Sequence, residues 1–164
     1  MKDKLIQWAQ GGDGDCMYKL SRRYLIEGDR QSCVYWLEKS AATKNFDAMT
    51  EYADLLRENG DCEKSFAIYK ELAETFLDEK SMEKIVDMVE RGQGVAVKDK
   101  DELNFVLTLI NKTYNEIYQI DRGNIFARIM TFQTRRHDEC TMEYLQAIER
   151  RRIAARVRKL LVAN

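Results

Sequence analysis

A pattern of small, apolar and capping residues that recurs along the chain constrains its fold more than any other feature. Residues 15–42 are typical of two helices joined by a short turn, with small and apolar side chains on one stripe of the first helix and Gly28 where that helix must end. The step to the next copy of the pattern brings Gly28 onto Gly60. The same step brings Asp15 onto Asp47, and we expect these two residues to be the N-caps of their helices.

The repeat extends on both sides of this segment. In the first pair of helices it consists of Cys16, Leu20, Ser21, Tyr24, Gly28, Val34, Trp36, Leu37 and Ala41. Their counterparts in the second pair are Ala48, Tyr52, Ala53, Leu56, Gly60, Phe66, Ile68, Tyr69 and Ala73. Leu5 and Ala9 match the end of a preceding half repeat. A further step reaches Ile85, Met88 and Gly92 but places Lys80 and Lys84 where small or apolar side chains are expected. Five extra residues then precede the second helix, in which Leu103, Phe105, Val106 and Ile110 resume the pattern. Two-helix units that recur at the spacing between Gly28 and Gly60 predict an all-α fold of stacked hairpins.

A small residue followed by L-[small]-x-x-Y-x-x-x-G, then an aromatic residue and a small pair, resembles the Sel-one-like repeat, a relative of the tetratricopeptide repeat. The first unit supplies this pattern as Cys16, Leu20, Ser21, Tyr24, Gly28, Trp36, Ala41 and Ala42. Residues 92–99, GQGVAVKD, resemble the G-x-G-V-x-x-D turn of that family, with the aspartate one position late. The resemblance covers residues 5–114. It implies a right-handed α-solenoid of about three helix-turn-helix repeats with a half-repeat N-terminal helix.

The repeat is lost after Tyr114. We expect an amphipathic helix over residues 124–134 and a long final helix from Asp138, or a neighbour, to about Ala163. One side of this final helix carries Met142, Ile153, Val157 and Leu160, and a basic face roughly opposite carries Arg151, Arg152, Arg158 and Lys159. Because terminal repeats of a solenoid need a polar outer cap, we expect one domain over residues 1–164, with repeats at 5–114 and capping helices at 115–164.

Composition favours a soluble helical protein. The 164 residues are 45% hydrophobic and 34% charged, and they include no proline. The chain shows neither the apolar region of a secretory signal nor an apolar run long enough to cross a membrane, so we expect a cytoplasmic protein with its four cysteines reduced. The net charge of −1 argues against a general polyanion binder, although residues 135–164 hold eight basic against four acidic residues.

Signals for catalysis and for metal binding are weak. His137 and Cys140 provide only two potential ligands, and nothing nearby would orient His137 as a base. The sequence GQGV lacks the Lys-Ser/Thr of a phosphate-binding loop, and GGDGD at residues 11–15 lacks the twelve-residue ligand spacing of a calcium loop. We therefore expect no catalytic residue, no cofactor and no metal site.

The family resemblance implies that the first helix of each hairpin lines a concave groove that holds a protein partner. The positions that it implies as partner-facing are Tyr18, Arg22, Thr50, Asp54, Arg57, Glu58, Met82, Val86 and Glu90. The alternative at each position is an ordinary solvated or core residue. We expect a non-enzymatic adaptor or inhibitor, of which a bacterial immunity protein that blocks a toxin is one version. Two alternatives are nucleic-acid binding through the basic face of the final helix, and homodimerisation through its apolar side.

Overall fold

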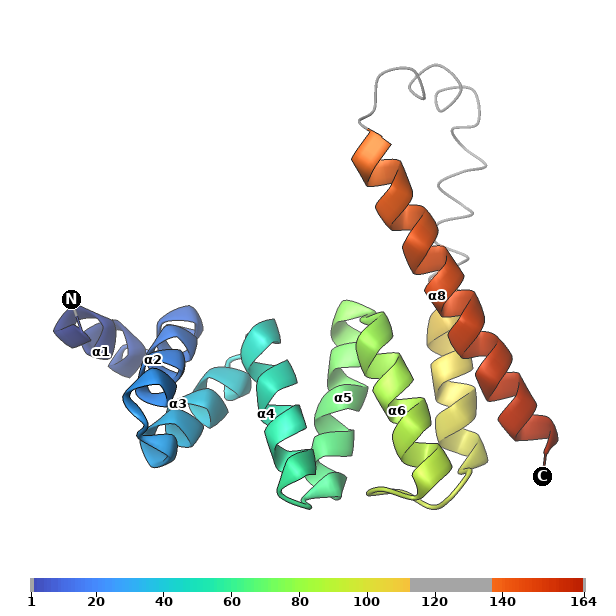
Figure 1. Cartoon of the computed structure of the whole chain (residues 1–164), viewed down its shortest axis with the longest axis horizontal. Helices are drawn as coiled ribbons and strands as arrows, with labels where there is room; N and C mark the ends of the chain where they lie inside the picture. Colours follow the sequence, from blue (N-terminus) through green and yellow to red (C-terminus); the bar gives the residue numbers. More distant parts are fainter. Residues whose placement is uncertain (1, 113–136, 164) are drawn as a thin grey trace. The chain divides into compact units, whose positions relative to one another are not determined.

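The computed structural model describes residues 2–112 and 137–163, with side chains at 4–112 and 148–163. All secondary structure in these ranges is helical, so the all-α prediction is confirmed for them. The helices are α1 (Lys2–Gln10), α2 (Gly14–Glu27), α3 (Arg30–Ala42), α4 (Phe46–Glu58), α5 (Cys62–Phe76), α6 (Glu79–Arg91) and α8 (His137–Val162), and residues 100–112 are also helical (Figure 1). None of the helices described is both long and apolar enough to cross a membrane. The helix predicted for 124–134 lies outside the described residues.

The chain separates into two compact units. Unit 1 is Met1–Leu72 and contains α1 to α4 and most of α5, whereas unit 2 is Ala73–Asn164 and contains α6, the helical segment 100–112 and α8. The single domain expected from the sequence stays a prediction.

Glycine ends the first helix of each pair, as predicted. Gly28, Gly60 and Gly92 are evenly spaced along the chain and have φ angles of 81°, 88° and 67°. Gly28 and Gly92 are the C-caps of α2 and α6, and Gly60 directly follows Asn59, the C-cap of α4. This left-handed conformation is unstrained for glycine because glycine has no Cβ.

The helix starts differ from the prediction by two residues. Asp13 caps α2 and Asn45 caps α4, and each side chain accepts a hydrogen bond of 2.9 Å from the backbone N–H three residues later. The predicted caps, Asp15 and Asp47, lie in the first turn instead. There, a carboxylate stabilises the helix through the macrodipole, so an acidic residue suits either position.

The start of α6 is displaced by one residue relative to the starts of α2 and α4, although Gly92 at its end keeps the spacing of Gly28 and Gly60. The step from the N-cap Asn45 to the N-cap Asp78 is one residue longer than the step from Asp13 to Asn45. Helix α2 buries four side chains, Cys16, Met17, Leu20 and Ser21. When α6 is aligned with this shift of one residue, the corresponding side chains are Ser81, Met82, Ile85 and Val86. All four are likewise buried.

The predicted alignment is therefore wrong by one residue at the start of α6, where it matched Lys80 and Lys84 to the buried positions. Further along the helix it agrees with the structure, since Ile85 and Met88 are buried and Gly92 is the C-cap. A shift of one residue turns the predicted face by about 100° around the helix axis.

The core of unit 1 joins α1 to α2. Ala9, Cys16, Met17 and Leu20 are buried together, and Leu5, Ile6, Tyr24 and Trp36 pack against them. Burial raises the pKa of the Cys16 thiol, which suits the small core residue expected at this position. A close helix approach occurs where the Ser40 hydroxyl donates a 2.7 Å hydrogen bond to the carbonyl of Gly14. A Cβ on Gly14 would lie only 2.0 Å from the Thr43 hydroxyl oxygen, so the position requires glycine as the side chains stand.

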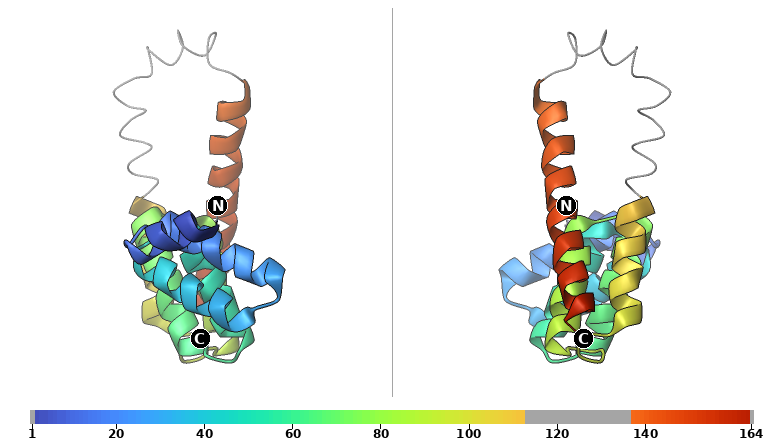
Figure 2. Two further views of the ribbon diagram at one scale, coloured as in Figure 1. Left: turned by 90° about the vertical axis from the view of Figure 1, so that its left-hand side faces the viewer. Right: turned by 90° about the vertical axis from the view of Figure 1, so that its right-hand side faces the viewer.

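Helix α8 is the long final helix that the sequence predicts. Its second half lies alongside the rest of unit 2, and its first half projects away from it (Figures 1 and 2). Ile153, Val157 and Leu160 are buried, as expected for the apolar side of this helix. Met142, the fourth residue of that side, lies outside the described side chains.

Candidate interaction surface

Two of the predicted partner-facing residues meet on a carboxylate that the sequence analysis missed. The Tyr18 hydroxyl of α2 donates a 2.7 Å hydrogen bond to Glu51 of α4, and the Arg22 guanidinium lies 3.2 and 3.3 Å from the two Glu51 oxygens. Partial burial, and then the hydrogen bond to Glu51, raise the pKa of Tyr18 to about 12. The hydroxyl therefore remains a donor throughout the physiological range, and these contacts hold Tyr18 and Arg22 in one orientation.

A second group of contacts fixes the predicted residues of α4. The Tyr69 hydroxyl donates a 2.6 Å hydrogen bond to Asp54, and Arg57 forms a longer ion pair of 3.8 Å with the same carboxylate. Burial and the bond to Asp54 raise the pKa of Tyr69 far above its ordinary value. Thr50 instead donates to the backbone carbonyl of Phe46 at 2.9 Å. Asp54 and Arg57 thus form one local network, and Thr50 is bonded within its own helix.

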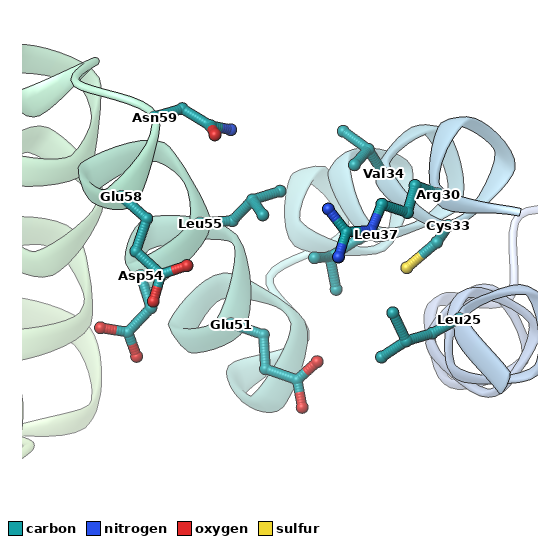
Figure 3. A pocket seen from close by; sticks show the side chains of 10 residues that line it. All are labelled: Leu25, Arg30, Cys33, Val34, Leu37, Glu51, Asp54, Leu55, Glu58 and Asn59. Carbon is teal, nitrogen blue, oxygen red and sulfur yellow. The ribbon is translucent and has the colours of Figure 1, made fainter. Parts of the chain in front are cut away.

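A cleft of about 420 Å³ opens between α3 and α4, next to these networks. Its lining residues are Leu25, Arg30, Cys33, Val34, Leu37, Glu51, Asp54, Leu55, Glu58 and Asn59. In Figure 3, Leu55 of α4 extends toward Val34 and Leu37 of α3, and Leu25 of α2 lies below them. The cleft therefore has aliphatic walls on both sides.

Acidic groups line the α4 side of this cleft. Glu51, Asp54 and Glu58 project from α4, whereas Arg30 is the basic group on the α3 side (Figure 3). Burial, followed by the nearby charge of Glu51, raises the pKa of the Cys33 thiol, so this thiol contributes a neutral, weakly polar surface. The cleft brings together two predicted residues, Asp54 and Glu58, with residues that the prediction did not include.

Met82 and Val86 do not face a partner in this structure. Both side chains are fully buried in unit 2, with 0% exposure, so their assignment to a partner-facing surface is corrected to a core position. The correction follows from the one-residue displacement of α6. The counterparts of Tyr18 and Arg22 on this helix are Glu83 and Asp87, and Glu90 from the original prediction lies on the same side of the helix.

Helix α8 covers this acidic side of α6. Arg152 forms an ion pair of 2.9 Å with Glu83, and Arg156 pairs with both Asp87, at 2.6 Å, and Glu90. Arg150 pairs with Glu79 one turn earlier on α6. The side of α6 that corresponds to the Tyr18 and Arg22 positions is therefore covered by another helix of the same chain.

The basic face predicted on α8 is only partly available. Arg151, Arg158 and Lys159 are exposed, whereas Arg152, although also exposed, is paired with Glu83 and with Glu149. Arg150 and Arg156, which also pair with carboxylates of α6, were not part of the predicted face. Some arginines of α8 thus pair with the acidic side chains of α6, and others lie on the outer surface.

The sequence contained signals for some of the missed residues. Leu25 and Leu55 fall outside the small and apolar stripe of the repeat, and their counterparts in the neighbouring repeat are the charged residues Arg57 and Arg23. When one repeat has arginine and the other has an apolar residue at the same position, the apolar residue indicates a surface site rather than a core site. Glu51 had no comparable signal, because an acidic residue on a helix surface is common.

Among the side chains that the structure describes, no group of three His, Cys, Asp or Glu is placed to hold a metal ion. Comparison with family models and with curated proteins finds no match for this chain.

Proposed function

We propose that the chain is a non-enzymatic protein–protein interaction module of Sel-one-like repeats, acting as an adaptor or an inhibitor in the cytoplasm. The proposal includes the right-handed solenoid, its concave groove and the capping role of α8. Recurring helix ends support the repeat. Left-handed glycines lie at 28, 60 and 92, and left-handed residues also precede the caps of α2, α4 and α6, namely Gly12, Lys44 and Leu77, with φ of 97°, 65° and 52°.

The observation that carries the proposal is the pre-ordered surface of unit 1. Tyr18, Arg22 and Asp54 are each held by hydrogen bonds to side chains of another helix or by ion pairs, and an aliphatic cleft lies beside them. Binding energy is greatest where side chains lose little freedom on association, because ordering a flexible side chain costs about 0.5–1.5 kcal/mol. Aromatic and arginine side chains next to an apolar pocket are also typical centres of protein interfaces.

The surface is confined to unit 1 because the corresponding row of α6 is already covered by α8. An inhibitor would use it to occlude a surface of its target, and a bacterial immunity protein that covers a toxin is one such inhibitor.

Two adjacent arginines of α2 allow a matched test. Arg22 pairs with Glu51 on α4, whereas Arg23 pairs with Glu27 on its own helix, and the two side chains are 51% and 48% exposed. We expect affinity capture from the source cell to retain a protein that Arg22→Glu loses and Arg23→Glu keeps. The capture is repeated at low and high salt with nuclease treatment. Equal retention by both variants would contradict a partner surface at Arg22.

The same capture tests the nucleic-acid alternative. Arg151 and Arg158 are exposed, so Arg151→Glu/Arg158→Glu removes the outer basic face and keeps the ion pairs of Arg150, Arg152 and Arg156 with α6. Nucleic acid that is retained at low salt and lost with this double variant would replace the protein partner as the ligand. Dimerisation through the apolar side of α8 would require Val157, which is fully buried in unit 2, to give up its packing within its own chain.

A further inference from the structure

We propose that α1 is a contact surface between two copies of this chain, which pair about a twofold axis near Trp8. The two α1 helices lie antiparallel across this axis, and each covers the tryptophan of the other. This dimer goes beyond the proposed function, because it does not depend on a protein partner at the Tyr18 and Arg22 surface.

Trp8 is exposed at a position that the later repeats bury. The spacing of the repeat matches Trp8 to Ser40 of α3 and to Leu72 of α5. Ser40 and Leu72 are both 0% exposed, whereas Trp8 is 57% exposed. The start of α2 covers Ser40, whose hydroxyl donates a 2.7 Å hydrogen bond to the Gly14 carbonyl. No described residue covers Trp8 to the same extent, so α1 presents an open face with an aromatic side chain that is typical of interface centres.

The surface around Trp8 carries no charge, which suits a twofold contact. Residues 5–12, LIQWAQGG, contain no charged residue in a chain of which 34% is charged. Near a twofold axis each side chain faces its own copy, so a charge there would be repelled by its equivalent. The exposed amides of Gln7 and Gln10 avoid this repulsion, because a glutamine amide both donates and accepts hydrogen bonds and can therefore pair with its own copy.

The charges that flank this segment favour the antiparallel arrangement. Lys4 is the nearest charged residue before it and Asp13 is the nearest after it, and both are exposed. The Asp13 N–H donates a 3.2 Å hydrogen bond to the Trp8 carbonyl, which places Asp13 at the C-terminal end of α1. Antiparallel helices bring the Lys4 end of one copy to the Asp13 end of the other. Opposite charges then meet at both edges of the contact.

The outer face of α8 argues against a head-to-tail contact. In such a contact α1 of one copy would meet the final helix of the next, on which Arg151, Arg158 and Lys159 are exposed. Covering these charges with an uncharged surface would remove them from water without a partner, which costs free energy. The face of α1 is therefore better matched to a second α1, and a twofold contact closes at two copies.

Sedimentation equilibrium of the full chain over a range of concentrations measures the association. We expect the average mass to rise from the 19.3 kDa of one chain toward twice that value and no further. Trp8→Glu places like charges at the axis, so we expect it to weaken association by about tenfold or more. Tyr35→Glu is the matched control, because Tyr35 is an aromatic residue of α3 with 51% exposure, and it should change association by about twofold or less.

Fluorescence tests the same contact without changing Trp8. The chain contains two tryptophans, so Trp36→Phe leaves Trp8 as the sole tryptophan. We expect its emission to move to shorter wavelength as the concentration rises, because pairing removes Trp8 from water. An emission that does not change with concentration would overturn the proposal.

The measured masses can overturn the proposal in three ways. The mass may stay at that of one chain, rise beyond that of two chains, or respond equally to Trp8→Glu and Tyr35→Glu. If a single chain instead captures a cellular protein that Trp8→Glu loses, that protein covers α1 and the second copy is wrong.

Discussion

Replacing Met82 with alanine tests the one-residue displacement of α6. Met82 has 0% exposure, so the substitution removes a packed thioether and leaves a cavity. Such core substitutions cost about 2–5 kcal/mol, whereas substitutions on an ordinary surface change stability by about 0.5 kcal/mol or less. The two placements of Met82, in the core or on a partner surface, therefore predict different losses of stability.

Urea unfolding followed by far-ultraviolet circular dichroism measures this loss. With a slope of about 2 kcal/mol/M, a loss of about 3 kcal/mol lowers the midpoint by about 1.5 M. Glu83→Ala is the matched control on the adjacent residue. It removes a partly exposed ion pair with Arg152, and we expect it to cost about 1 kcal/mol or less.

The opposite result would refute the displacement. If Met82→Ala changed stability by less than Glu83→Ala and abolished capture of a partner, Met82 would lie on the surface. The period of the first two repeats would then continue unchanged through α6.

Three further changes test the caps and the α6–α8 contact. The backbone hydrogen bond from Cys16 holds the pKa of Asp13 below its ordinary value. The ionised Asp13 cap therefore contributes its whole stabilisation at pH values above the pKa of the unfolded state. This stabilisation is lost as the pH falls through the lower pKa of the folded state. Asp13→Asn keeps the cap without the titration, and the acid midpoint of unit 1, followed by tryptophan fluorescence, should move to lower pH. Gly28→Ala should cost about 1–2 kcal/mol in thermal unfolding and Gly28→Asn less, because φ is 81° and no atom lies within 4 Å of the added Cβ. Arg156→Ala should cost about 1 kcal/mol at low salt and less at high salt in the same assay, since its partners are partly exposed.

Local chemistry explains what the sequence determined. The spacing of small and apolar residues predicted the helices, and Gly28, Gly60 and Gly92 predicted their ends, because a left-handed backbone has a strong preference for one residue type. The N-caps were misplaced by two residues because aspartate is favoured both at the cap and in the first turn. The long α8 followed from the absence of proline and glycine over its length.

Tertiary packing decided the rest. The sequence contained the mismatch at Lys80 and Lys84, but only burial showed that α6 is displaced and that Met82 and Val86 belong to the core. The pairing of Arg152 with Glu83 joins residues 69 positions apart, and such a separation leaves no periodic trace in the sequence. The cleft depends likewise on the distance between α3 and α4, which is set by the side chains packed between neighbouring helices rather than by either helix alone.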